Sequence, residues 1–223
     1  CADTAPEDIA DIERFARQPR RHVRFREGDV FRFPIDRRLY GYGRVLLNYD
    51  AMRKGDTPFW DIFMGKPLVC SVYHIVTERD NVTAEELKGL RSLPSTVITD
   101  NGLYYGEYPI VGHIPLGQQE DYPILYGRSI DVRKREWVCL QWGRVYRELE
   151  GVESVLGEMQ CNLGSSFQLN CRLDILQQCI EAGSNQPYWE GFYPAYVNGD
   201  LRNPKFAQER ETVARQMGVL LAI

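Results

Sequence analysis

Hydrophobic residues recur at every second position along much of the chain from Val23 to Leu149, which is the spacing of half-buried β-strands. A β-hairpin is predicted near the start of this region. Its first strand is the run from Val30 to Phe33, its turn is the sequence PIDRR, and its second strand is RLYGYGRVL (38–46). The segment PLVCSVYHIV (67–76) is almost continuously apolar, so we expect a central strand covered on both faces. The middle of the chain is therefore predicted to be mostly β-structure.

Two further stretches of this region carry strand signals. Asn101-Gly102 lies between two strand-like runs and predicts a tight hairpin, because this dipeptide suits the turns that join antiparallel strands. The stretch KREWVCLQWGRVYREL (134–149) predicts one more long strand.

The segment 38–46 alternates glycine with tyrosine. In a strand, Tyr40, Tyr42 and Arg44 would share one face, while Gly41 and Gly43 would leave the other face as bare backbone. Glycine weakens a strand and usually marks a bulge, a bend or the close approach of another group. We expect the tyrosines to face the core or line a groove, and the glycines to admit a neighbouring strand or helix; contact with a ligand or partner protein is the alternative.

Helical spacing appears near both ends of the chain. Residues 4–19 carry a capping box and an apolar stripe, and residues 83–90 predict a short capped helix. Residues 171–182 and a short aromatic segment from Pro187 also read as helices, and the stretch 203–218 has Asn203 as N-cap, Pro204 in its first turn and Gly218 past its end.

Strands followed by helices are typical of an α+β fold. We expect one domain over 1–223: an N-terminal helix (1–19), a mostly antiparallel sheet or small barrel (23–150), and a helical extension (151–223) packed with the first helix on one side.

The charge of the chain is unevenly distributed. The net charge is −4, and residues 148–223 contain five Lys or Arg against ten Asp or Glu, so the negative excess lies in the C-terminal third. This balance argues against nucleic acid and favours a basic protein partner, although an acidic solvated surface would look the same. The apolar runs are too short for a membrane span. The six cysteines read mostly as small buried hydrophobic residues, so we expect a cytoplasmic protein in a reducing compartment. The first residue, Cys1, leaves open the lipid-anchored terminus of a bacterial lipoprotein.

Catalytic and metal-binding patterns are sparse. The six cysteines lack the paired spacings of zinc or dithiol sites, and no serine-nucleophile motif is present. His74 and His113 could converge with Asp29 or Glu107 on a metal ion, but histidines on strands more often form structural hydrogen bonds. We therefore expect no cofactor.

Three segments together resemble the immunity protein 26 family of bacterial polymorphic toxin systems. They are FREGDVFRFPIDRRLYGYGRVL (25–46), IVGHIPL (110–116) and WVCLQWGRVYREL (137–149), so the resemblance covers residues 23–150. It implies a non-catalytic antidote that neutralises a cognate toxin by protein contact. A related family name belongs to an organophosphate triesterase, which makes a metal-assisted phosphotriester hydrolase the alternative.

The resemblance implies scaffold roles for the motif residues. They are Gly28, Asp29, Phe31, Pro34, Tyr40, Gly41, Tyr42, Gly43, Arg44, Gly112, His113, Pro115, Trp142 and Gly143. The toxin-binding surface is then expected elsewhere, among acidic and aromatic residues that suit electrostatic steering and anchoring. The candidates are Trp60, Glu181, Tyr188, Trp189, Glu190, Asp200, Glu209 and Glu211.

Overall fold

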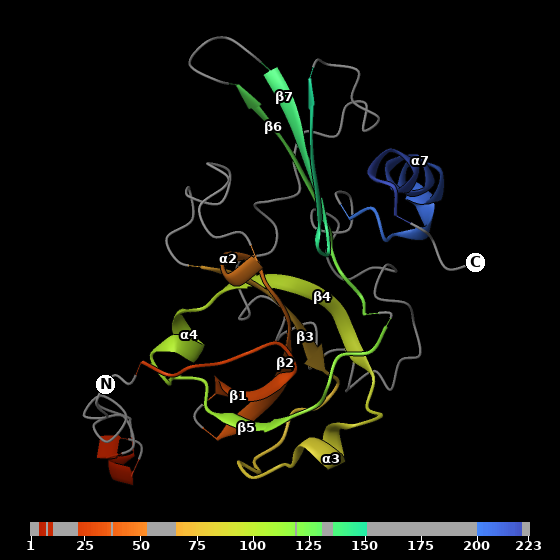
Figure 1. Cartoon of the computed structure of the whole chain (residues 1–223). Helices are drawn as coiled ribbons and strands as arrows, with labels where there is room; N and C mark the ends of the chain where they lie inside the picture. The colour runs from red at the N-terminus through yellow and green to blue at the C-terminus, as the bar shows by residue number, and fades with distance from the viewer. Residues whose placement is uncertain are drawn as a thin grey trace.

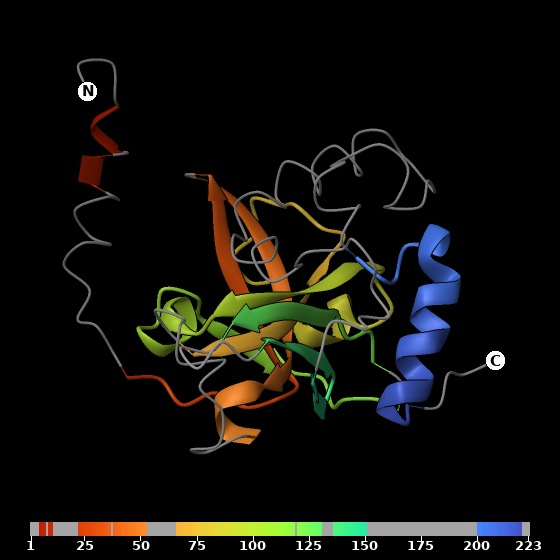
Figure 2. The same cartoon turned by 90° about the horizontal axis from the view of Figure 1, so that it is seen from above.

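The computed structural model describes residues 5–7, 9–10, 22–36, 38–52, 66–118, 120–130, 136–150 and 200–219. Within these ranges the chain forms a five-stranded and a three-stranded antiparallel sheet, with helix α7 against the smaller sheet (Figures 1 and 2). This confirms the predicted α+β class. In the described part of the chain, neither sheet closes into a barrel.

The larger sheet has the strand order β4-β3-β2-β1-β5. Its strands are β1 (Asp29–Asp36), β2 (Leu39–Asn48), β3 (Pro67–Tyr73), β4 (Ser92–Thr99) and β5 (Ile110–His113). Strands β1 and β2 form the predicted hairpin. Strand β3 lies between β2 and β4, and all its residues are buried, which confirms the predicted central strand.

The two glycines of β2 face two phenylalanines of β1. Phe31 is the register partner of Gly43, and Phe33 is the partner of Gly41. A Cβ atom at either glycine would lie 2.5 Å from a ring carbon of the facing phenylalanine. The close approach predicted at these glycines is therefore made by two phenyl rings of the neighbouring strand. The rings pack on each other and on Tyr108, with centroids 6.0–6.1 Å apart.

The hairpin predicted at Asn101-Gly102 is wrong. After β4 the chain forms the single-turn helix α4 (Asn101–Tyr104), and it then crosses to β5 at the opposite edge of the sheet. Helix α4 buries Leu103 in the core that contains Phe31 and Phe33. Packing of this apolar side chain therefore outweighs the local preference of the dipeptide for a hairpin turn.

The smaller sheet consists of β6 (Ile124–Ile130), β7 (Glu136–Trp142) and β8 (Val145–Glu150). The single long strand predicted over 134–149 is wrong, because the chain reverses between Trp142 and Val145, which are register partners. Gly143 has a φ of +53°, a conformation that glycine adopts at little cost. The Gln141 side chain donates a hydrogen bond of 2.6 Å to the Gly143 carbonyl and holds the turn.

The described C-terminal segment follows the sequence prediction. The Asn203 side chain accepts a hydrogen bond from the Lys205 amide and caps the 3₁₀ turn η2 (Pro204–Phe206), which leads into α7 (Ala207–Met217). Gly218 ends α7 with a φ of 69°. Val213 and Met217 of α7 are buried in one cluster with residues of β6 and β7.

The end of the smaller sheet that contains Ile124 and Leu125 lies between the larger sheet and α7. On β6, Ile124 packs with Val213 of α7, while Leu125 packs with Leu47 and Val69 of the larger sheet. Successive residues of a strand point to opposite faces, so β6 joins the two cores. The single-turn helix α2 (Tyr49–Met52) follows β2, and its Tyr49 is buried in the same core as Leu125.

Several predicted segments lie outside the described residues. The N-terminal helix (4–19) is described only in part, by one helical hydrogen bond of 3.1 Å from the Ile9 amide to the Ala5 carbonyl. The helix at 171–182 and the segment from Pro187 lie wholly outside. None of the helices in the described ranges has the length and apolar character needed to span a bilayer.

Candidate interaction surface

A long loop connects β3 to β4, although these strands are adjacent and antiparallel. It comprises residues 74–91, and its ends are joined by a 2.8 Å hydrogen bond from the His74 amide to the Arg91 carbonyl. Its ends lie close together as in an Ω-loop, although it is longer than the usual members of that class, and surface loops of this kind often carry function. It includes helix α3 (Ala84–Leu87), which lies beside β5 in Figure 1. We call residues 74–91 the Ω-loop.

The side of the Ω-loop that faces the larger sheet packs into a hydrophobic core. Val82 and Leu87 are buried together with Val30 of β1 and with Tyr42 and Tyr73 of β2 and β3. The loop therefore covers one face of the larger sheet, opposite the face on which the phenyl rings cross the glycines.

Tyrosines of the glycine strand hold the backbone of the Ω-loop. The Tyr42 hydroxyl donates a 2.7 Å hydrogen bond to the Arg79 carbonyl and accepts one of 3.4 Å from the Val82 amide. Tyr40 and Thr77 exchange two backbone hydrogen bonds of 2.8 and 3.1 Å. The tyrosines thus meet the sequence expectation of facing the core, and they also fix the shape of a loop distant in sequence.

Arg32 of β1 completes this support. Its guanidinium donates a 2.6 Å hydrogen bond to the Asp80 carbonyl and lies 4.6 Å from the centroid of the Tyr40 ring. These contacts and those of Tyr42 reach the loop backbone, so the charged side chains of residues 78–80 are left exposed to solvent.

The side of the Ω-loop that faces away from the sheet is charged and exposed to solvent. Residues 78–81 and most residues of 83–91 are exposed to solvent. Residues 83–90 contain the predicted capped helix, in which Thr83 and Glu86 form a capping box at the start of α3, and Arg79 binds Glu86 at 2.8 Å. The hydrogen bond from the Thr83 amide, followed by that from Arg79, lowers the pKa of Glu86 to about 2. These contacts keep the carboxylate charged.

Asp29 and His113 form a carboxylate–imidazole pair at the edge of the larger sheet. They are register partners at the start of β1 and the end of β5, and His113 Nδ1 lies 2.9 Å from Asp29 Oδ1. The other oxygen, Asp29 Oδ2, accepts a 2.9 Å hydrogen bond from the Arg26 amide. The Asp29 side chain is 11% exposed, whereas that of His113 is 35% exposed. A nearly buried carboxylate therefore orients a partly exposed imidazole.

Two motif glycines make room for this arrangement. Gly28 has a φ of +89°, and a Cβ there would lie 2.7 Å from His113 Cε1. A Cβ at Gly112 would lie 2.7 Å from the Cβ of Ala84, the first residue of α3. The first glycine admits the His113 ring, and the second brings the Ω-loop against β5. Because successive strand residues point to opposite faces, the His113 ring and α3 lie on opposite faces of β5.

The remaining motif residues are spread over both sheets. Arg44 forms an ion pair of 2.5 Å with Glu120, and both side chains are largely buried. Trp142 packs beside the core under α7, and Gly143 forms the β7–β8 turn next to Tyr122. Two motif prolines, Pro34 and Pro115, are exposed. Gly28, Asp29, Gly112 and His113 are the motif residues that converge on the exposed edge at β5.

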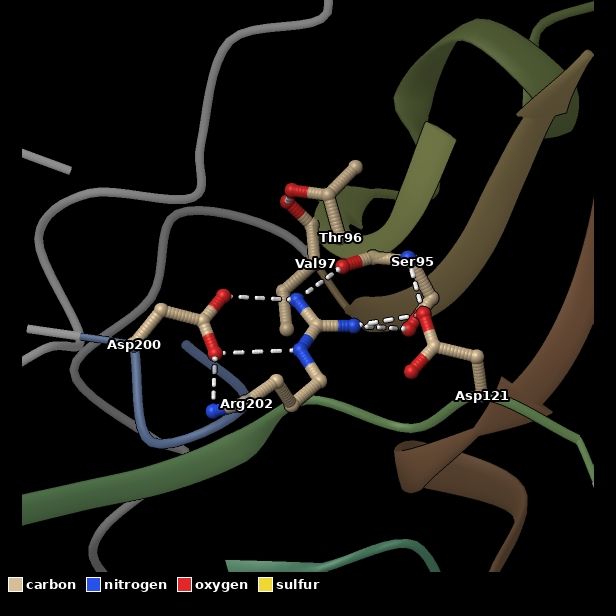
Figure 3. A network of polar contacts seen from close by, with 6 residues as sticks. All are labelled: Ser95, Thr96, Val97, Asp121, Asp200 and Arg202. Carbon is tan, nitrogen blue, oxygen red and sulfur yellow. Dashed lines mark hydrogen bonds and ion pairs between the residues drawn. The ribbon is translucent and has the colours of Figure 1, made fainter. Parts of the chain in front are cut away.

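Arg202 attaches the C-terminal segment to the larger sheet (Figure 3). Its guanidinium donates hydrogen bonds to Asp200 at 2.8 and 3.0 Å, to Asp121 at 2.6 Å and to the Ser95 carbonyl at 2.9 Å. Burial alone would lower the pKa of Arg202, but Asp200 and Asp121 outweigh it and raise the pKa. Asp121 also accepts a 2.7 Å hydrogen bond from the Ser95 amide, so two side chains satisfy the outer backbone groups of Ser95.

Three of the partner-binding candidates lie within the described residues. Asp200 is bound to Arg202, whereas Glu209 is half-buried and Glu211 exposed on α7. The others lie outside the described residues: Trp60, Glu181, Tyr188, Trp189 and Glu190.

The histidines considered for metal binding have different surroundings. Burial, and then the charge of Arg91, lower the pKa of His74 below its ordinary value. His113 is paired with Asp29, one of the two carboxylates considered for the metal site. Across the described ranges, no group of three or more His, Cys, Asp and Glu side chains is placed to hold a metal ion.

Sequence reasoning missed the Ω-loop, although it considered His113 and Asp29 as neighbours in a metal site. A usable signal was the long interval between the strand-like runs 67–73 and 92–99, which exceeds what a hairpin needs. The pairing of His113 with Asp29 had no local signal, because the two residues lie 84 positions apart.

Comparison with known proteins gives one family match. The family model described as Immunity protein 26 matches residues 26–138, which covers half of the chain and includes β1 to β6. A search of curated proteins and a search of solved structures found no match. No comparison supports the phosphotriesterase alternative.

Proposed function

Because this chain belongs to the immunity protein 26 family, we propose that it is an antidote that binds the toxic domain of a bacterial polymorphic toxin and blocks it by protein contact. The observation that carries the proposal is the family match over residues 26–138. Such an antidote would meet its toxin in the cytoplasm and needs no reacting centre of its own.

The architecture is suited to this role. The motif residues Tyr40 and Tyr42, together with Arg32, hold the backbone of the Ω-loop, and the charged side chains of residues 78–80 stay exposed. A surface that is already ordered loses little conformational entropy when a partner binds, which favours affinity. Binding by such a surface requires no rearrangement of the sheet beneath it.

The charge distribution favours a basic toxin domain. The C-terminal third carries twice as many acidic as basic residues, and Glu211 is exposed on α7. Opposite charge on the partner would speed association by electrostatic steering, an effect that salt weakens. The toxin domain is thus proposed to carry a positive surface.

Co-expression tests this function directly. If the neighbouring gene encodes a toxin, its C-terminal domain is expressed in a bacterial host, alone, with this chain, or with an unrelated immunity protein. We expect growth to be rescued by this chain alone, and a stable complex to elute from size-exclusion chromatography. Continued killing in the presence of well-folded chain would refute the proposal.

A further inference from the structure

The segment that leads into β1 presents positive charge on one side. The side chains of His22, Arg24 and Arg26 are exposed, whereas those of Val23 and Phe25 are half-buried. Phe25 packs against the core of the larger sheet. Because an extended backbone directs alternate side chains to opposite sides, His22, Arg24 and Arg26 share the outer side. We call these three residues the basic strip.

Hydrogen bonds and a ring contact hold the basic strip in place. The Val23 amide donates a 2.8 Å hydrogen bond to the Tyr104 carbonyl, and the Arg26 amide donates one of 2.9 Å to Asp29 Oδ2. The His22 ring stacks on the Tyr104 ring, with their centroids 4.8 Å apart. A strip that is already ordered loses little conformational entropy when a partner binds.

The two guanidinium groups of the strip keep donors that no internal partner uses. Among the described residues, none forms a hydrogen bond or an ion pair with Arg24. The Arg26 side chain is 75% exposed, and its contact with Asp29 is a loose 3.7 Å from Nε to Oδ1. Asp29 does not depend on this contact, because His113 Nδ1 and the Arg26 amide already bind its two oxygens. Both guanidinium groups are therefore available to a partner.

The charge of the strip is not neutralised by the acidic residue that follows it. Glu27 is bound by Arg144 and accepts a 3.2 Å hydrogen bond from the Asn48 amide. In the sequence, residues 14–26 contain six Arg and no Asp or Glu. The segment leading into β1 and helix α7 lie on opposite sides of the molecule in both views (Figures 1 and 2). The basic strip is thus remote from the α7 surface that is proposed to face a basic partner.

The chemistry of the strip favours a carboxylate-bearing partner. A guanidinium is planar and presents a fork of N–H donors that matches the two oxygens of a carboxylate. A phosphate would fit the same fork, but the net charge of −4 disfavours a long polyanion such as a nucleic acid. An acidic protein segment is therefore the better match.

We propose that the basic strip binds an acidic segment of a partner protein, whose carboxylates pair with Arg24 and Arg26. The bound segment lies along residues 22–26, and the stacked His22 ring forms one end of the site. This inference goes beyond the proposed function, because it concerns the opposite charge and another side of the molecule. It does not depend on the identity of the toxin.

Three double variants separate specific binding from net charge. Arg24→Gln with Arg26→Gln removes both guanidinium groups but keeps polar side chains and the Arg26 amide. Arg24→Lys with Arg26→Lys keeps the charge and removes the fork of donors. The matched control is Lys88→Gln with Arg215→Gln, which removes two exposed positive charges elsewhere.

Binding of a fluorescently labelled oligoglutamate peptide is measured by anisotropy, and the thermal midpoint is measured for each variant. We expect the Gln variant of the strip to weaken binding about tenfold or more and the Lys variant to weaken it less. The control should stay within about twofold of the wild-type chain, and all midpoints should be unchanged. A labelled single-stranded oligonucleotide should bind more weakly than the peptide.

Three results would overturn the inference. The first is a wild-type chain that does not bind oligoglutamate, and the second is equal weakening in the Gln variant of the strip and in the control, which would show an effect of net charge alone. The third is tighter binding of the oligonucleotide than of the peptide, which would indicate a nucleic-acid surface. None of these results affects the proposed function, because co-expression with the toxin domain tests that function separately.

Discussion

At the scale of single residues, the two faces of β2 have different partners. Gly41 and Gly43 leave space for the rings of Phe33 and Phe31, while Tyr42 on the opposite face binds the backbone of the Ω-loop. A phenyl ring lying across a glycine of the next strand buries backbone that would otherwise be open, which offsets the low strand preference of glycine.

The two glycines differ in what surrounds them, which gives a matched pair of substitutions. A Cβ at Gly43 would meet the Phe31 ring at 2.5 Å and also the Ser71 carbonyl at 2.9 Å, whereas the close atoms at Gly41 are all side-chain atoms. Side chains can move aside and a central strand's backbone cannot. We expect Gly43→Ala to lower the free energy of unfolding by about 2 kcal/mol, with a smaller loss for Gly41→Ala. Urea denaturation measures both, and equal losses would contradict this account.

At the scale of elements, side chains form hydrogen bonds with backbone groups of the edge strand β4 that a further strand would otherwise pair. Next to the edge strand β4, Asp121 accepts the Ser95 amide hydrogen, and Arg202 donates to the Ser95 carbonyl. Edge strands expose such groups and are commonly protected. The same arginine connects α7 and its preceding turn to the larger sheet (Figure 3).

Loss of Arg202 should therefore loosen the C-terminal segment. Arg202→Met removes the guanidinium that binds Asp200, Asp121 and the Ser95 carbonyl, and removing one partner of a buried ion pair costs about 3–5 kcal/mol. We expect a large loss in the free energy of unfolding and faster proteolysis near residues 200–219. The control is Arg215→Met on the exposed side of α7, which should change little. Equal behaviour of the two variants would show that the Arg202 contacts contribute nothing.

At the scale of the whole molecule, several tyrosines are buried in the hydrophobic cores or pack against them. Burial raises the pKa of Tyr42, Tyr49, Tyr73, Tyr108 and Tyr122 above the ordinary value of 10.0. Their phenols therefore lose protons less readily in the folded than in the unfolded chain.

This difference predicts sensitivity to alkali. A raised pKa in the folded state means that the tyrosines contribute their full stability below the unfolded value of 10.0, and that stability falls as pH rises above it. Urea unfolding between pH 8 and about pH 11 should show a constant free energy of unfolding and then a decline. Tyr49→Phe should make the decline shallower, since Tyr49 is deeply buried. An unchanged slope in this variant would exclude Tyr49 as a source.

The sequence by itself determined the features that depend on neighbours a few residues away. Alternation and β-branching predicted β1, β2 and β3. The segment 83–90 predicted the short capped helix α3, and the residues Asn203 and Gly218 predicted the limits of the C-terminal helical segment. The motif order also predicted the family that the comparison confirmed.

Tertiary structure alone decided the rest. Burial of Leu103 turned an expected hairpin into α4, and the positive φ of Gly143 divided an expected strand into β7 and β8. The pairs Asp29–His113 and Ser95–Arg202 join positions 84 and 107 residues apart. Such contacts form only when sheet pairing has brought distant segments together, because their energy depends on geometry that no local stretch of sequence contains.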